Sequence, residues 1–163
     1  MPQSDLTMNE SRQIETQAMS TRRPTVTVLG TGTNFAQEIL AGSHRLTADE
    51  PFSAGGSDTG PNPYDLLLSS LGACTSMTVA LYARRKYWPL ARVTVKLSHA
   101  KAHADDCAEC DPHDGVIDHI EREIELTGPL TGDQKTRLIA IAGKCPIHRT
   151  LTSNIDIRTH LVR

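Results

Sequence analysis

The chain has 163 residues and a formal net charge of -2. We expect no nucleic-acid partner, because polyanion binders carry a strong basic excess. No run of about 18 residues is apolar throughout, so we also expect no transmembrane helix and no membrane partner. Four cysteines are too few for a disulfide-dense secreted domain. The polar N-terminus lacks a secretory signal, which predicts a loose extension over 1–23, a single domain over 24–163 and a cytoplasmic location.

The N-terminal part of the domain has the pattern of short strands. Apolar and polar residues alternate from Pro24 to Gly30, which predicts the first strand. Two more short strands are expected over Phe35–Leu40 and His44–Ala48. A loop rich in Gly, Ser and Pro follows from Glu50 to Asn62.

The longest predicted helix runs from Pro63 to about Tyr87. Asn62 is a good cap and Pro63 suits the first turn. Gly72 and Ala73 would allow another helix to approach closely. Residues at helical spacing form one continuous stripe: Leu67, Leu71, Cys74, Thr78 and Leu81. Because apolar residues cover so much of its circumference, we expect this helix to lie at the centre of the fold.

Alternating residues predict two further strands, Arg92–His103 and His119–Leu126. In the second of them Ile120, Ile124 and Leu126 are expected to face inward. The polar segment from Ala104 to Gly115 joins the two strands, so we expect a hairpin with a long connection.

The C-terminal part predicts helices and a closing strand. Thr131 is expected to cap a helix that runs to about Gly143, with an apolar face of Leu138, Ile139 and Ala142. A short turn through Arg149 is expected to follow, and then a strand with Ile155, Ile157 and Leu161 on one face. Strands that gather before and after helices, rather than alternating with them, predict an α+β fold.

Two cysteines are candidate reactive residues. Cys74 lies on the apolar stripe of the long helix, where a cysteine is usually a packed core thiol. Cys145 precedes Pro146, which suits the first position of a helix, so Cys145 is expected at the N-cap. Free backbone N–H groups there favour a thiolate, and positive charge is contributed nearby by Lys144, His148 and Arg149.

A reactive Cys74 needs a cation from another element. The helix dipole fades beyond the terminal turn, and Cys74 lies about three turns into its helix. The candidate thiolate-activating residues are Arg45, with Glu50 near it in sequence, Arg149, and an arginine of a partner subunit.

The run Gly60-Pro-Asn-Pro-Tyr-Asp-Leu-Leu-Leu-Ser-Ser-Leu-Gly-Ala-Cys74, together with Cys145-Pro146, resembles the signature of the OsmC/Ohr family. The resemblance extends from about Pro24 to the C-terminus and is closer to the OsmC-related branch. It implies an intertwined homodimer in which antiparallel sheets wrap long central helices, with two active sites at the subunit interface.

The resemblance also implies a chemistry. Cys74 would attack an organic hydroperoxide and become a sulfenic acid, Cys145 would resolve it to a disulfide, and an external dithiol reductant would reopen that disulfide without a cofactor. The sequence departs from the peroxidase members at two positions. Tyr64 stands where they carry a Glu, and the turn Gly30–Asn34 lacks their Arg.

A second group of residues has the composition of a metal or secondary redox site: His103, Cys107, Cys110 and His113. It lacks a second well-spaced ligand pair and is crowded by acidic residues, so we favour a polar loop with surface thiols over a zinc site. The alternative to a peroxidase is a binding or sensing module. Such a module would hold a small apolar or electrophilic ligand between the central helices without turnover. A third alternative is a metal-binding protein centred on Cys107 and Cys110.

Overall fold

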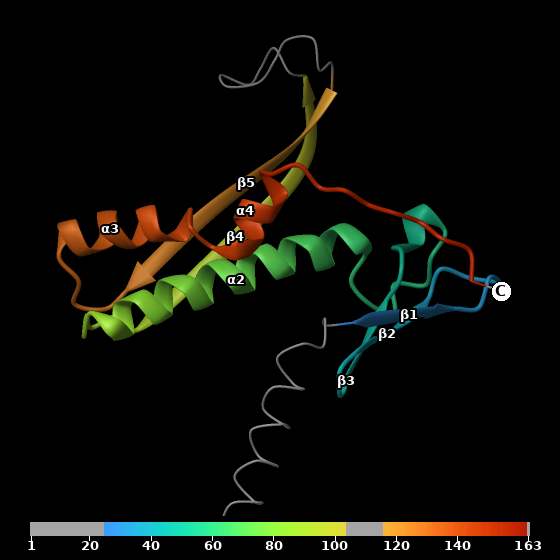
Figure 1. The fold of residues 1–163 in the computed structure, drawn as a ribbon, viewed down its shortest axis with the longest axis horizontal. Coiled ribbons are helices and arrows are strands. Elements are labelled where there is room, and N and C mark those ends of the chain that lie inside the picture. The colour runs from blue at the N-terminus through green and yellow to red at the C-terminus, as the bar shows by residue number, and fades with distance from the viewer. Residues whose placement is uncertain (1–24, 104–115, 163) are drawn as a thin grey trace, which may run out of the picture. The chain divides into compact units, whose positions relative to one another are not determined.

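The computed structural model describes residues 25–103 and 116–162. They belong to two compact units, which meet in sequence between Asn62 and Pro63 (Figure 1). The extension expected over 1–23 lies outside the described residues. Each unit contains an antiparallel sheet, and the second also contains the helices, so the α+β class predicted from the order of elements is confirmed.

The N-terminal unit is built on a three-stranded antiparallel sheet. Its strands are β1 (Val26–Gly30), β2 (Gln37–Ala41) and β3 (His44–Ala48), in the order β1-β2-β3. Gly42 lies in the tight turn between β2 and β3 with φ 62°, a conformation that glycine adopts without strain. All three expected strands are present, and β2 starts two residues later than predicted.

A buried carboxylate organises the loop that follows β3, which contains the short 3-10 helix η1 (Phe52–Ala54). Asp49 is 2% exposed. It accepts hydrogen bonds from the backbone of Glu50, Ser57 and Thr59, and from the Thr59 hydroxyl. Burial raises the pKa of Asp49, but these hydrogen bonds outweigh burial and the pKa is lowered.

The C-terminal unit is built around α2 (Pro63–Arg85), which contacts β4, α3 and α4 (Figure 1). The helix is as long and central as predicted, but its buried face differs from the predicted stripe. The buried residues are Leu71, Gly72, Thr75, Val79 and Ala83, whereas Leu81 is 45% exposed. A helix that is apolar over most of its circumference does not reveal by periodicity which line of residues its neighbours cover.

By length and hydropathy alone, α2 could also cross a membrane, which the sequence reading did not expect. A core helix can have the same composition, and 28% of the apolar window of α2 is buried within the described residues. Val79 and Ala83 form the buried cluster of this unit together with Leu138 and Ala142 of α3.

The strands β4 (Arg92–His103) and β5 (Val116–Thr127) form the antiparallel hairpin on which α2 lies. β4 has the predicted bounds, and β5 begins three residues earlier than predicted. A Cβ atom on Gly72 would lie 2.9 Å from Leu97 Cδ1. The close approach that we expected from another helix is therefore made by a strand, through the end of the Leu97 side chain.

Two helices and an extended segment complete the unit. Thr131 caps α3 (Gly132–Ala142) with a reciprocal capping box to Gln134. The buried residues of α3 are Leu138, Ile141 and Ala142, so the prediction of Ile139, which is 47% exposed, was wrong by half a helical turn.

After α4 (Pro146–Leu151), the expected closing strand is also wrong, because 154–162 form no strand with any described residue. Alternation in sequence does not by itself make a strand, because a strand also needs a second backbone to pair with.

Candidate active site

Cys145 occupies the position that the sequence predicted, the N-cap of α4. Pro146 is the first helical residue. The N–H of His148 lies in the first turn, where it has no acceptor within the helix, so it can bond the cap. That N–H donates to Cys145 Sγ over 3.3 Å. The Cys145 side chain is completely buried, so this sulfur is solvated by protein donors instead of water.

Cys74 lies beside it. α4 packs on α2, and the Cys74 side chain donates a hydrogen bond to Cys145. Both residues are free thiols, Cys74 half-buried and Cys145 buried. The two cysteines that the sequence singled out therefore meet, and only Cys74 is open to solvent.

Two residues that the sequence analysis did not select complete this contact. Thr75 Oγ1 is fully buried and donates to Cys145 Sγ over 3.7 Å. Arg122, on β5, donates from Nη1 to Thr75 Oγ1 over 2.9 Å. The available signal was the position of Arg122, which is an arginine between Ile120 and Ile124 on the inward face of a strand.

The donors around Cys145 favour its thiolate. Burial raises the pKa of Cys145, but hydrogen bonds from the His148 backbone, Thr75, Cys74 and the Ile147 backbone outweigh burial. The pKa is lowered from its ordinary value of 9.0. A lowered thiol pKa next to a second thiol is the arrangement required for disulfide chemistry.

The other predicted activating residues lie elsewhere. Arg45 pairs with Glu38 in the N-terminal unit and is 73% exposed, and Glu50 follows Asp49 in the same unit. Arg149, on α4, lines an open hollow of about 490 Å³ with Pro146, Thr150, Thr152 and Ser153. Their roles toward Cys74 stay predictions. In the contacts described above, the cation that reaches the cysteine pair is Arg122, through Thr75.

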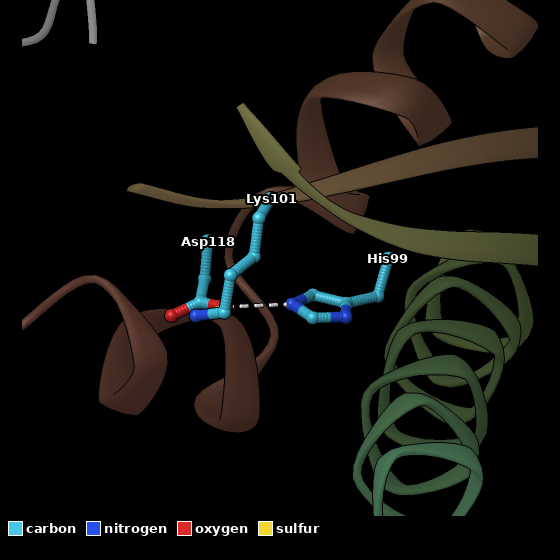
Figure 2. Close-up of polar contacts among 3 residues, drawn as sticks. All are labelled: His99, Lys101 and Asp118. Atoms are coloured by element: carbon cyan, nitrogen blue, oxygen red, sulfur yellow. Dashed lines mark hydrogen bonds and ion pairs between the residues drawn. The ribbon is translucent and has the colours of Figure 1, made fainter. Parts of the chain in front are cut away.

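A polar cluster occupies the far end of the same hairpin face. Figure 2 shows His99 and Lys101 converging on Asp118, with His99 Nε2 at 2.8 Å and Lys101 Nζ at 3.0 Å from Asp118 Oδ1. Tyr64 stacks on the His99 ring, with centroids 4.4 Å apart. Tyr64 thus connects the first turn of α2 to β4.

Most of the candidate metal or redox group lies outside the residues that the structure describes. Cys107, Cys110 and His113 lie outside the described residues, and His103 ends β4. Within 25–103 and 116–162, no group of three or more His, Cys, Asp or Glu side chains could hold a metal ion.

The family model for OsmC-like proteins matches residues 55–160. This range includes α2, Cys74, Thr75, Arg122 and Cys145. Among curated proteins, no relative is found.

Several solved structures have a similar fold. An OsmC-like protein from Mycoplasma pneumoniae aligns with a TM-score of 0.62 at 21% identity, over 80% of this chain and 88% of its own. An organic hydroperoxide resistance protein from Legionella pneumophila aligns with a TM-score of 0.59 at 21% identity, over 83% and 93%. Another, from Elizabethkingia anophelis, aligns with a TM-score of 0.60 at 20% identity, over 83% and 91%. At these identities the likeness establishes a shared fold.

Proposed function

This chain belongs to the OsmC-like protein family, and from that premise we propose that it reduces organic hydroperoxides with Cys74 and Cys145, in defence against oxidative or osmotic stress. The observation that carries the proposal is the contact between two free thiols, one half-buried and the other buried at a helix N-cap. Two proteins of similar fold are named organic hydroperoxide resistance proteins, which supports the substrate class.

The different exposure of the two thiols supports the roles that we propose for them. Cys74 is proposed as the peroxidatic residue, because it is the thiol of the pair that a peroxide can approach from solvent. Its thiolate attacks the terminal oxygen of the hydroperoxide, the O–O bond breaks, and the alkoxide leaves and takes a proton to become the alcohol. Cys74 is left as a sulfenic acid, which is still reversible.

Cys145 is the resolving residue. Its thiolate attacks the Cys74 sulfur, the S–O bond breaks, and hydroxide leaves and is protonated to water. The resulting disulfide prevents further oxidation of Cys74. An external dithiol then reduces the disulfide by thiol–disulfide exchange, so that both cysteines return as thiols and the reductant becomes the disulfide. The cycle needs no metal or organic cofactor.

We further propose that the protein acts as a homodimer in the cytoplasm. The dimer follows from the family resemblance, in which two sites lie at the subunit interface. It would also give the apolar residues of 154–162 a neighbour, since Ile157 is 82% and Leu161 is 92% exposed.

Single-turnover oxidation of the reduced protein tests this function. Wild type, Cys74→Ser and Cys145→Ser would each be mixed with cumene hydroperoxide or hydrogen peroxide, and the products mapped by mass spectrometry. We expect a Cys74–Cys145 disulfide in wild type, Cys74 oxidised to sulfenic acid in Cys145→Ser, and faster reaction with the organic peroxide.

The double variant Cys107→Ser/Cys110→Ser is the matched control, since it removes the other two thiols and leaves the proposed pair. It should turn over like wild type. If Cys74 and Cys145 stay reduced for as long as a free thiol in the same peroxide, the peroxidase function is wrong. Stoichiometric uptake of a small ligand without turnover would then identify a binding module.

A further inference from the structure

We infer that Thr75 and Arg122 are positioning residues that hold Cys145 ready to attack Cys74 and to leave it again during reduction. The inference rests on the proposed function for its chemical steps. It adds to that function Thr75 of α2, which donates a hydrogen bond to the resolving sulfur, and Arg122 of β5, which donates one to Thr75.

The direction of the hydrogen bonds follows from the chemistry of the three groups. A guanidinium has only donors, so Thr75 Oγ1 must accept the bond from Arg122. A hydroxyl has one proton, and that proton is then left for Cys145 Sγ, 3.7 Å away. Arg122 therefore fixes Thr75 as a donor to the sulfur, which is the role that stabilises a thiolate.

A shared carbonyl holds this arrangement in place. The Ala142 oxygen, at the end of α3, accepts from Arg122 Nη1 over 3.5 Å. The same oxygen accepts from the Cys145 backbone N–H over 3.4 Å. Arg122 is thus tied to the Cys145 backbone as well as to the hydroxyl that contacts its sulfur. A cation also suits the negative end of α3.

Both steps assigned to Cys145 use a negative sulfur. In disulfide formation its thiolate is the nucleophile, and hydroxide leaves Cys74. In reduction the thiolate of the external dithiol attacks Cys74 Sγ, the S–S bond breaks, and its electron pair leaves with Cys145. The donors Thr75 Oγ1 and His148 N stabilise that leaving thiolate.

Among the ionisable groups of the surrounding elements, Cys74 of α2 and Arg122 of β5 belong to the hydrogen-bond network of Cys145. Lys144, His148 and Arg149 lie in the segment that carries Cys145 itself. Cys74 is a second free thiol in contact with Cys145, and thiolate absorbance does not distinguish two thiols. A clean test therefore removes Cys74.

The first experiment titrates Cys145 as the single thiol. The background carries Cys74→Ser, Cys107→Ser and Cys110→Ser, and thiolate absorbance is measured against pH with Cys145→Ser in that background as the blank. We expect Thr75→Val and Arg122→Gln to move the midpoint to higher pH. Thr75→Ser should restore it, and Arg122→Lys should restore part of it. Thr78→Val, one turn along α2, should not move it.

The second experiment measures disulfide formation after peroxide in the chain that keeps Cys74. Thr75→Val should slow this step by about threefold to tenfold at neutral pH. The loss of a hydrogen bond to a charged sulfur is partly offset, because a more basic thiolate is more nucleophilic. Formation of the sulfenic acid, the preceding phase, should change less.

The outcomes separate this inference from the function on which it rests. A folded Thr75→Val with the same Cys145 midpoint as Thr78→Val would overturn the inference, whatever peroxide does. Absence of any disulfide in wild type would overturn the proposed function, while the titration still tests the hydrogen bonds. If Thr75→Val does not fold, Arg122→Gln tests the same shift of the Cys145 midpoint without a change in α2.

Discussion

The hydroxyl of Thr75 lies 3.7 Å from the sulfur of Cys145, although the two residues are 70 positions apart in the chain. One turn of the central helix thus supplies both the partner thiol, Cys74, and a donor for the buried cysteine. A buried thiol without donors would have a raised pKa and would be a poor nucleophile. The contacts in this protein have the opposite effect, and they lead to the first prediction.

The rate of disulfide formation should rise at a lower pH than it would with an ordinary cysteine in place of Cys145. The folded protein lowers the pKa of Cys145 from 9.0, so its thiolate forms as the pH rises toward that value and is already present below it. We expect the rate of the second, disulfide-forming phase to rise with pH and to level off below pH 9.0. Stopped-flow mixing with cumene hydroperoxide measures it, and a half-maximal rate at or above pH 9.0 would contradict the prediction.

Truncation of Leu138 should destabilise the protein far more than truncation of its neighbour. Leu138 is completely buried in the cluster with Val79, whereas Ile139 is 47% exposed. Leu138→Ala should lower the free energy of unfolding by about 2–5 kcal/mol, because it removes apolar contacts and leaves a cavity. Ile139→Ala is the matched control on the same helix. Urea unfolding of the full chain measures both variants. Equal losses of unfolding free energy would contradict the assignment of Leu138, and not Ile139, to the core-facing side of α3.

A side chain at Gly72 should disturb the contact between helix and hairpin. A Cβ atom there would lie 2.9 Å from Leu97 Cδ1, closer than normal packing allows. Gly72→Val should cost about 1–3 kcal/mol of unfolding free energy, because overpacking outweighs the gain in helix propensity. Ala73→Val, at the next and exposed position, should cost less. Thermal unfolding of the two variants measures the difference. Equal losses for Gly72→Val and Ala73→Val would mean that the contact between α2 and β4 tolerates a side chain at Gly72.

Asp49 should stabilise the N-terminal unit only while it is ionised. Its folded pKa is lowered below the ordinary value of 3.8, so the stabilisation is fully present above pH 3.8 and is lost as the pH falls through the lower folded value. Asp49→Asn should reduce the urea midpoint at neutral pH, and the difference from wild type should shrink well below pH 3.8. Asp58→Asn, in the same loop but exposed, is the control. A difference that persists unchanged in acid would point to packing instead of charge.

The sequence alone determined the local features of this protein. Thr131 and Cys145 cap helices because a cap depends on residues within one turn of the chain, and both were predictable for that reason. The strands of the two sheets follow from the alternation of apolar and polar residues, and the long helix follows from apolar residues at helical spacing. The two cysteines could be selected because the motif that ends at Cys74 and the Cys-Pro pair at Cys145 are continuous in sequence.

The tertiary structure decided what each face meets. Periodicity shows which residues share a face, but the neighbour of that face comes from distant parts of the chain. For this reason Ile139 was chosen in place of Ile141, and a final strand was expected where no described backbone pairs with it. Arg122 became part of the site only when the β4–β5 hairpin packed against α2, because its effect passes through Thr75 to a sulfur on a third element.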